Sequence, residues 1–150
     1  MSSIEIYNYL KKSLGIIIKH LEEAGVLVIP ALLGAKLAEH LNISVPAGES
    51  YMLLDIAIGG RVHEVLIISP SPEFSVKVTV DGVVIWDKSY SEASAITDEL
   101  VFISAFQRED GKYVYHLSEI PFKSSIKVEV INISQATVVF DKLLAKYEVM

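Results

Sequence analysis

The sequence has no cysteine and comparatively few basic residues, and each shortage removes a class of function. Without cysteine the chain cannot form a disulfide scaffold, a thiolate zinc site or a cysteine nucleophile. The 13 Lys and Arg residues stand against 19 Asp and Glu residues, which gives a formal net charge of −6. Because surfaces that bind nucleic acid need an excess of Lys and Arg, no nucleic-acid partner is expected.

Catalytic signatures are also missing from the sequence. The four histidines (His20, His40, His63 and His116) show none of the close spacings that metal ligands use. Gly-x-Ser-x-Gly, the phosphate-binding Walker loop and Gly-x-Gly-x-x-Gly do not occur. We therefore expect a protein that is not an enzyme, with no catalytic residue, no cofactor and no metal site. His63 and His116 are expected to be isolated strand residues.

No uncharged apolar stretch of 18 residues occurs, so the sequence predicts no transmembrane helix. The first residues lack the basic start of a signal peptide, and the localisation stays open, with a virion among the alternatives. The longest apolar run, Ala24–Ala35, is expected to form a buried helical hairpin, and membrane contact is the rarer alternative. Asn and Gln are scarce, which together with the lack of Cys is typical of thermophile proteins.

The residues that are present divide into a helical N-terminal segment (1–42) and a β domain (43–150). In the first part, apolar residues recur every three or four positions, as on one face of a helix: Tyr7, Leu10, Leu14, Ile17, Leu21 and Ala24. Gly25 is a natural helix end and Pro30 can open a second helix, so helices are predicted over 4–41. The apolar stripe packs either within the chain or between subunits of a homo-oligomer.

The second part follows an apolar period of two between turn signals, which predicts strands. Turns at Gly59-Gly60, Asp81-Gly82, Asp110-Gly111 and near 132–135 divide it into four hairpins, since Gly and Asp tolerate the positive φ of tight turns. The eight predicted strands are Tyr51–Ile58, Arg61–Ser69, Phe74–Val80, Val83–Asp87, Leu100–Glu109, Lys112–Leu117, Ser125–Ile133 and Ala136–Val149. The predicted fold class is mainly β, an antiparallel eight-stranded β-sandwich, most simply a jelly roll, preceded by helices.

Two-residue turns also fix which residues face each other. In the second hairpin this register points Trp86, the only Trp, out of the sandwich, where protein or, less commonly, a sugar would cover it. In the third hairpin Phe106 faces Tyr115 on a core face. In the first hairpin Asp55 meets Glu64, an unfavourable pair of like charges that a different register or a bound cation would relieve.

A resemblance adds to this interpretation. The segment from Asp55 to Asp81 runs from Gly-Gly through a strand to Ser-Pro and through a further strand to Asp-Gly. Residues 142–149 read Lys-Leu-Leu-Ala-Lys-Tyr-Glu-Val. With these features residues 50–150 resemble β-sandwich structural proteins of tailed phages and archaeal viruses. The likeness is a pattern of strands and transfers no functional residue. It implies a virion or tail component that associates with itself and with other virion proteins.

Two functions from different classes follow. The first is a non-enzymatic structural or assembly protein that self-associates, and the second is a ligand- or carbohydrate-binding β-sandwich module. The candidate interaction residues are Tyr7, Leu10, Leu14, Ile17, Leu21 and Trp86. A sugar-binding module would need several aromatic side chains on one exposed face, and Trp86 is the only clear candidate.

Overall fold

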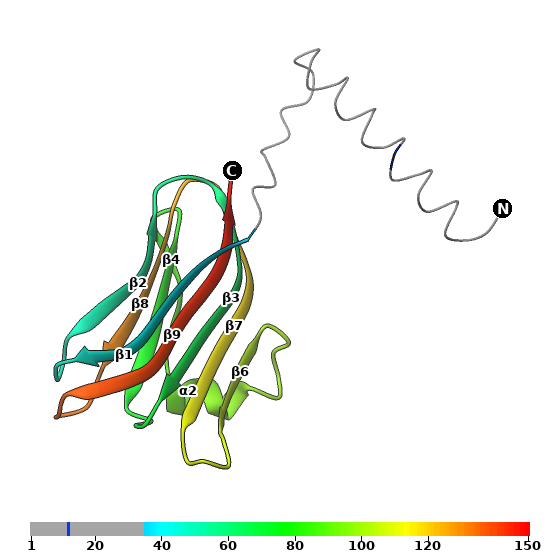
Figure 1. Cartoon of the computed structure of the whole chain (residues 1–150). Helices are drawn as coiled ribbons and strands as arrows, with labels where there is room; N and C mark the ends of the chain where they lie inside the picture. Colours follow the sequence, from blue (N-terminus) through cyan, green and yellow to red (C-terminus); the bar gives the residue numbers. More distant parts are fainter. Residues whose placement is uncertain (1–11, 13–34) are drawn as a thin grey trace. The chain divides into compact units, whose positions relative to one another are not determined.

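Strands make up most of the described part of the chain. The computed structural model describes Lys12 and residues 35–150, whose path is drawn in Figure 1. The strands are β1 (Lys36–Val45), β2 (Ser50–Ile56), β3 (Gly60–Ser69), β4 (Phe74–Val80), β5 (Val83–Ser89), β6 (Ile103–Gln107), β7 (Tyr113–Phe122), β8 (Ile126–Asn132) and β9 (Val138–Val149). A short helix, α2 (Tyr90–Ile96), lies between β5 and β6. The mainly β fold class is confirmed.

Two antiparallel sheets face each other around one hydrophobic core. Sheet A has the strand order β1-β9-β3-β7-β6, and sheet B has the order β2-β8-β4-β5. The alternation expected of half-buried strands is clear on β4, where Phe74, Val76 and Val78 are buried. Sheet A contributes Ile67 and Tyr115 to the same core. The two-sheet sandwich is therefore confirmed, and β1 is a strand beyond the eight that the sequence predicts.

The strands pair in a nested order. β1 pairs with β9, β2 with β8, β3 with β7 and β4 with β5, all antiparallel. Of the four predicted hairpins, those at Asp81-Gly82 and Asp110-Gly111 exist. The other two are wrong, because Gly59-Gly60 and residues 133–137 carry the chain from one sheet to the other. At Gly60 a Cβ atom would collide with the carbonyl oxygen of Glu148, so this glycine permits a close approach between strands.

Strand β1 corrects the predicted second helix. Residues 36–41 lie along the edge of sheet A, where Leu37 faces Lys146 and Leu41 faces Lys142 across the β1–β9 ladder. The predicted helix is therefore wrong for these residues, and the predicted boundary between residues 42 and 43 falls inside the strand. Residues 1–11 and 13–34 of the predicted helical segment lie outside the described residues, and Lys12 is helical.

A β-bulge in β5 reverses the expected orientation of Trp86. Val84 lies opposite Thr79, but Trp86 lies opposite Val78, so Ile85 is an extra residue with no partner on β4. Because Val78 faces the core, Trp86 also turns inward and packs against the core. The prediction that this side chain points outward is wrong for that reason.

The turn between β6 and β7 also differs from the expected two-residue form. The backbone amide of Arg108 donates to the carbonyl of Lys112, so three residues form the loop. As a result Phe106 lies opposite Val114. Tyr115 is buried as predicted, whereas Phe106 is an exposed residue, so the predicted pair of core aromatics is wrong.

Helix α2 connects β5 of sheet B to β6 of sheet A. The Ser89 hydroxyl accepts a hydrogen bond from the amide of Glu92, and the Glu92 carboxylate accepts one from the amide of Ser89. This capping box fixes the start of the helix, and Tyr90 and Ala93 are buried in the core. The Ser-x-x-Glu spacing is a signal in the sequence from which this helix could have been predicted.

Candidate functional site

An apolar slot opens where β5 of sheet B faces β7 and the loop before β6. Its volume is about 150 Å³, close to the volume of one large side chain. The lining residues are Ile85, Trp86, Phe102, Leu117 and Ile120. The rings of Trp86 and Phe102 meet edge to face with their centroids 6.1 Å apart, which is a favourable aromatic geometry.

Trp86 is held in place by a hydrogen bond across the sandwich. Its indole N–H donates to the hydroxyl of Tyr115 at 2.6 Å, and that hydroxyl donates to the carbonyl of Lys88 at 3.1 Å. Burial raises the pKa of the Tyr115 hydroxyl above its ordinary value, although the hydrogen bond from Trp86 opposes this change. The hydroxyl therefore stays protonated and acts as a structural link between β5 and β7.

Exposed apolar residues lie on β5 and just before β6, and two of them, Ile85 and Phe102, line the slot. We call this group the edge patch, and it consists of Val83, Val84, Ile85, Val101 and Phe102. The first three follow each other on β5, with exposed fractions of 63%, 47% and 53%. β5 is the edge strand of sheet B, so one row of its backbone groups has no strand partner among the described residues. An apolar edge strand of this kind is a template for pairing with another chain.

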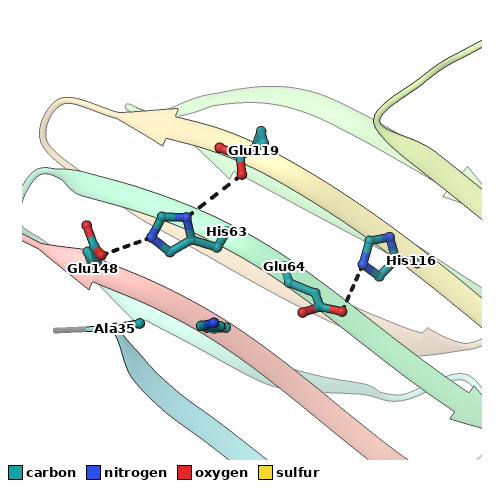
Figure 2. A pocket seen from close by; sticks show the side chains of 7 residues that line it. Ala35, His63, Glu64, His116, Glu119 and Glu148 are labelled. Carbon is teal, nitrogen blue, oxygen red and sulfur yellow. Dashed lines mark hydrogen bonds and ion pairs between the residues drawn. The ribbon is translucent and has the colours of Figure 1, made fainter. Parts of the chain in front are cut away.

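A second and polar site, which we call the His63 pocket, lies on the outer face of sheet A (Figure 2). Its volume is about 520 Å³, and it spans β9, β3 and β7. The lining residues are Ala35, His63, Glu64, His116, Glu119, Lys146 and Glu148. Carboxylates, imidazoles and an amine thus meet in one depression.

The backbone is irregular on two neighbouring strands at this pocket. On β3, Val62 pairs with Tyr147 and Glu64 pairs with Lys146, which leaves His63 as an extra residue relative to β9. On β7, Glu119 has φ of 58°, a left-handed conformation that residues other than Gly rarely adopt. Bulges and strained residues of this kind commonly redirect side chains at functional sites. Here they place His63 and Glu119 close together.

Three His–Glu contacts connect the strands of the pocket. His63 Nε2 lies 3.2 Å from the Glu148 carboxylate on β9, and His63 Nδ1 lies 3.8 Å from the Glu119 carboxylate on β7. His116 Nε2 lies 3.0 Å from the Glu64 carboxylate. All of these side chains are partly exposed, so each contact contributes little to stability. The arrangement can bind hydroxyl or amino groups of a ligand.

The pocket does not resemble a metal centre. Among Lys12 and residues 35–150, no group of three or more His, Cys, Asp or Glu side chains is arranged to hold a metal ion. The Asp55–Glu64 pair that the sequence predicts does not form, because Asp55 lies in sheet B opposite Lys127 and Glu64 lies in sheet A. The cation considered for that pair therefore has no site there.

Of the predicted interaction residues, Trp86 alone lies within the described part of the chain. Trp86 lies in the apolar slot, although it faces the core, whereas Tyr7, Leu10, Leu14, Ile17 and Leu21 lie outside the described residues. His63 and His116, expected to be isolated, line one pocket because β3 and β7 are neighbours. The pairing of β3 with β7 is the signal that sequence reasoning lacked, since it predicted β2 as the partner of β3.

No known family model matches the chain, and no curated protein is significantly similar to it. The described part of the chain contains no helix with the length and apolarity needed to span a bilayer.

Proposed function

We propose that this chain is a non-enzymatic structural or assembly protein, a virion- or phage-like β-sandwich component that associates with itself. The nested strand order supports this class. When four nested antiparallel strand pairs roll up as a jelly roll, they produce two facing sheets with the orders β1-β9-β3-β7 and β2-β8-β4-β5. The protein has these orders, with β6 added at the edge of sheet A. Jelly rolls are frequent in viral capsid proteins, and this support is an analogy at the level of the fold.

The edge patch is the observation that carries the proposal of self-association. An apolar edge strand without charged side chains can associate with another chain. Val83, Val84 and Ile85 are consecutive, exposed and without a charge among them, on a strand at the edge of its sheet. Burying such a surface against a partner releases the water that covers it, which favours association.

The mass of the full chain in solution tests the proposal. We expect size-exclusion chromatography with light scattering at roughly 50 µM, where micromolar association is visible, to give a multiple of 16.6 kDa. Replacing Leu14 and Ile17 by Asp tests whether the N-terminal stripe also holds subunits together. The double variant should lower the mass and keep a cooperative melt with β circular dichroism. A native chain that stays monomeric contradicts the proposal.

The His63 pocket favours the alternative function, a ligand- or carbohydrate-binding module. Its carboxylates and imidazoles are the polar groups that bind sugar hydroxyls, although no Phe, Tyr or Trp side chain lines it. A screen of neutral and amino sugars by isothermal calorimetry, with Glu148→Gln as the matched variant, tests this alternative. Binding that Glu148→Gln weakens at least tenfold would support it, and heats equal to those of buffer for every sugar would contradict it.

A further inference from the structure

Two Asn-x-Ser tripeptides occur in the chain, Asn42-Ile43-Ser44 and Asn132-Ile133-Ser134. This tripeptide, with any residue except Pro in the middle, is the acceptor for N-linked glycans. The fold gives the two asparagine side chains very different surroundings. We infer that Asn42 is an acceptor site for an N-linked glycan in the folded protein and that Asn132 is not. This inference is independent of the proposed self-association.

The side-chain amide of Asn132 is fully occupied by contacts within the fold. Asn132 is 0% exposed, and its Nδ2 donates to the carbonyls of Val45 and Ala136, both at 2.8 Å. Its Oδ1 accepts hydrogen bonds from the amide and the hydroxyl of Ser134, the serine of the same tripeptide. A sugar on Nδ2 would break the donor bonds and force a bulky polar group into the interior. The tripeptide at 132–134 is therefore explained by the turn that it builds.

Asn42 lies at the surface instead. It belongs to β1, the edge strand of sheet A, and both Asn42 and Ser44 are exposed. The ladder to β9 pairs Leu41 and Ile43 and skips the asparagine between them. Asn42 has φ of 54°, a left-handed conformation that Asn tolerates better than most residues. This conformation accounts for an asparagine at position 42, but it does not require an exposed serine two positions later.

Glycan transfer needs an accessible amide on a segment that can enter an enzyme. The donor is an oligosaccharide linked to a lipid diphosphate. Nδ2 of Asn42 forms a bond to C1 of the first sugar, the bond from C1 to the diphosphate oxygen breaks, and the amide gives up one proton as the lipid diphosphate leaves. At Asn42 the strand is held by β9 alone, so a short local opening frees the tripeptide. Asn132 ends β8, which lies between β2 and β4 inside sheet B.

A glycan at Asn42 would also protect an open edge of the sandwich. β1 exposes Leu37 and Leu41, with exposed fractions of 58% and 54%, beside a row of backbone groups that has no strand partner among residues 35–150. Apolar edge strands without protection pair with other chains. A glycan is bulky and strongly hydrated, so next to Leu41 it would prevent a further strand from adding to sheet A.

Glycan transfer to the folded full chain tests the inference. The reagents are a purified oligosaccharyltransferase and its lipid-linked donor, with the enzyme chosen because it modifies synthetic peptides of residues 38–46 and 128–136 to the same extent. In these peptides both tripeptides are free of the fold. In the folded chain we expect peptide mass spectrometry to find the glycan on Asn42, with an occupancy at Asn132 that is lower by at least about tenfold, because the fold withholds that amide.

Ser44→Ala is the matched variant, because it keeps Asn42 and its left-handed backbone and removes only the hydroxyl that the enzyme recognises. It should receive no glycan at Asn42 and should keep the cooperative thermal melt of the native chain. A folded chain modified equally at both asparagines, at Asn132 alone or at neither would overturn the inference. A native chain that is glycosylated at Asn42 and stays monomeric would contradict the proposed self-association and leave this inference standing.

Discussion

The indole N–H of Trp86 donates a hydrogen bond of 2.6 Å to the hydroxyl of Tyr115, and this bond joins an edge strand of sheet B to the interior of sheet A. Without the bulge at Ile85 the indole would point into solvent and the Tyr115 hydroxyl would be left without this donor. The irregular strand and the polar link therefore depend on each other.

Replacing Tyr115 by Phe should lower the free energy of unfolding by about 1–3 kcal/mol, because the indole N–H of Trp86 and the carbonyl of Lys88 each lose a partner. Trp86→Phe also shrinks an aromatic side chain beside the slot. A double-mutant cycle, measured by urea unfolding with circular dichroism, isolates the pair. We expect a coupling of about 1 kcal/mol. Additive single effects would mean that the bond contributes nothing.

Asp81 makes a contribution to stability that acid should remove. Its carboxylate accepts hydrogen bonds from the backbone amides of Ser124, Ser125 and Lys123, which lower its pKa from 3.8 to about 2. Because the folded-state pKa is lower than the unfolded one, the contribution is complete above about pH 4 and disappears as the pH falls through about 2.

The test compares the native chain with Asp81→Asn, since Asn also tolerates the left-handed backbone at this position, where φ is 52°. Urea unfolding should show the variant to be less stable at pH 7. The difference should narrow steadily below pH 4 and vanish near pH 2. A gap that is independent of pH would contradict the role of the carboxylate charge. Asp98→Asn, in the loop after α2, serves as the control.

Gly60 is expected to tolerate an added side chain poorly. Adding a Cβ atom there drives it into the Glu148 carbonyl and to 2.9 Å from the ring of Phe122, so the paired strands must separate. Gly60→Ala should lower the melting temperature sharply, with a loss above about 3 kcal/mol. Gly48→Ala is the control. Its φ of 74° makes Ala unfavourable, yet nothing lies within 4 Å of the new atom, and the loss should be about 1 kcal/mol.

The native Glu119 is not expected to favour the stability of the fold. Its left-handed backbone is strained, and its two contacts, to Arg61 and His63, are both 3.8 Å long and exposed. Because Asn adopts this conformation more readily, Glu119→Asn should leave the free energy of unfolding unchanged or raise it by up to about 1 kcal/mol. Glu129→Asn, in the regular strand β8, should lower it, since Asn is disfavoured in strands. A large loss at Glu119 would show that its contacts matter for folding.

The local pattern of the sequence was enough to predict strands, because burial on one face imposes a period of two wherever the partner strand lies. Phe74–Val80 was predicted with the bounds that the structure has. The partner strand was predicted correctly at Asp81-Gly82, where both turn residues have the positive φ of a tight turn, and at Asp110-Gly111, where a three-residue loop shifts the register. Gly59-Gly60 is an equally common turn signal, but neither residue has positive φ, and nothing in the sequence distinguishes a turn glycine from one that admits a neighbouring backbone.

The errors at β1 and at the two sites come from pairing between strands, which the local sequence pattern does not encode. Residues 36–41 contain good helix formers, and only the ladder to β9, near the other end of the chain, makes them a strand. The bulges at Ile85 and His63 insert one residue into a ladder and exchange the two faces of a strand, which no periodicity can anticipate. The His63 pocket was missed because the pairing of β3 with β7 was not predicted, and Trp86 was assigned the wrong orientation because of the bulge at Ile85.

The nested pairing of β1 with β9 has a consequence for how the protein is made. The outermost pair of the nest joins the first and the last strands of the described residues, so β1 can join sheet A only after β9 has been synthesised. A topology dominated by distant partners folds slowly, because a long loop must close before its contacts form. Until then Val83 to Trp86 on β5 is already outside the ribosome with an open apolar edge. Nascent chains close to one another on the same messenger are thus exposed to association through this edge before either has completed its fold.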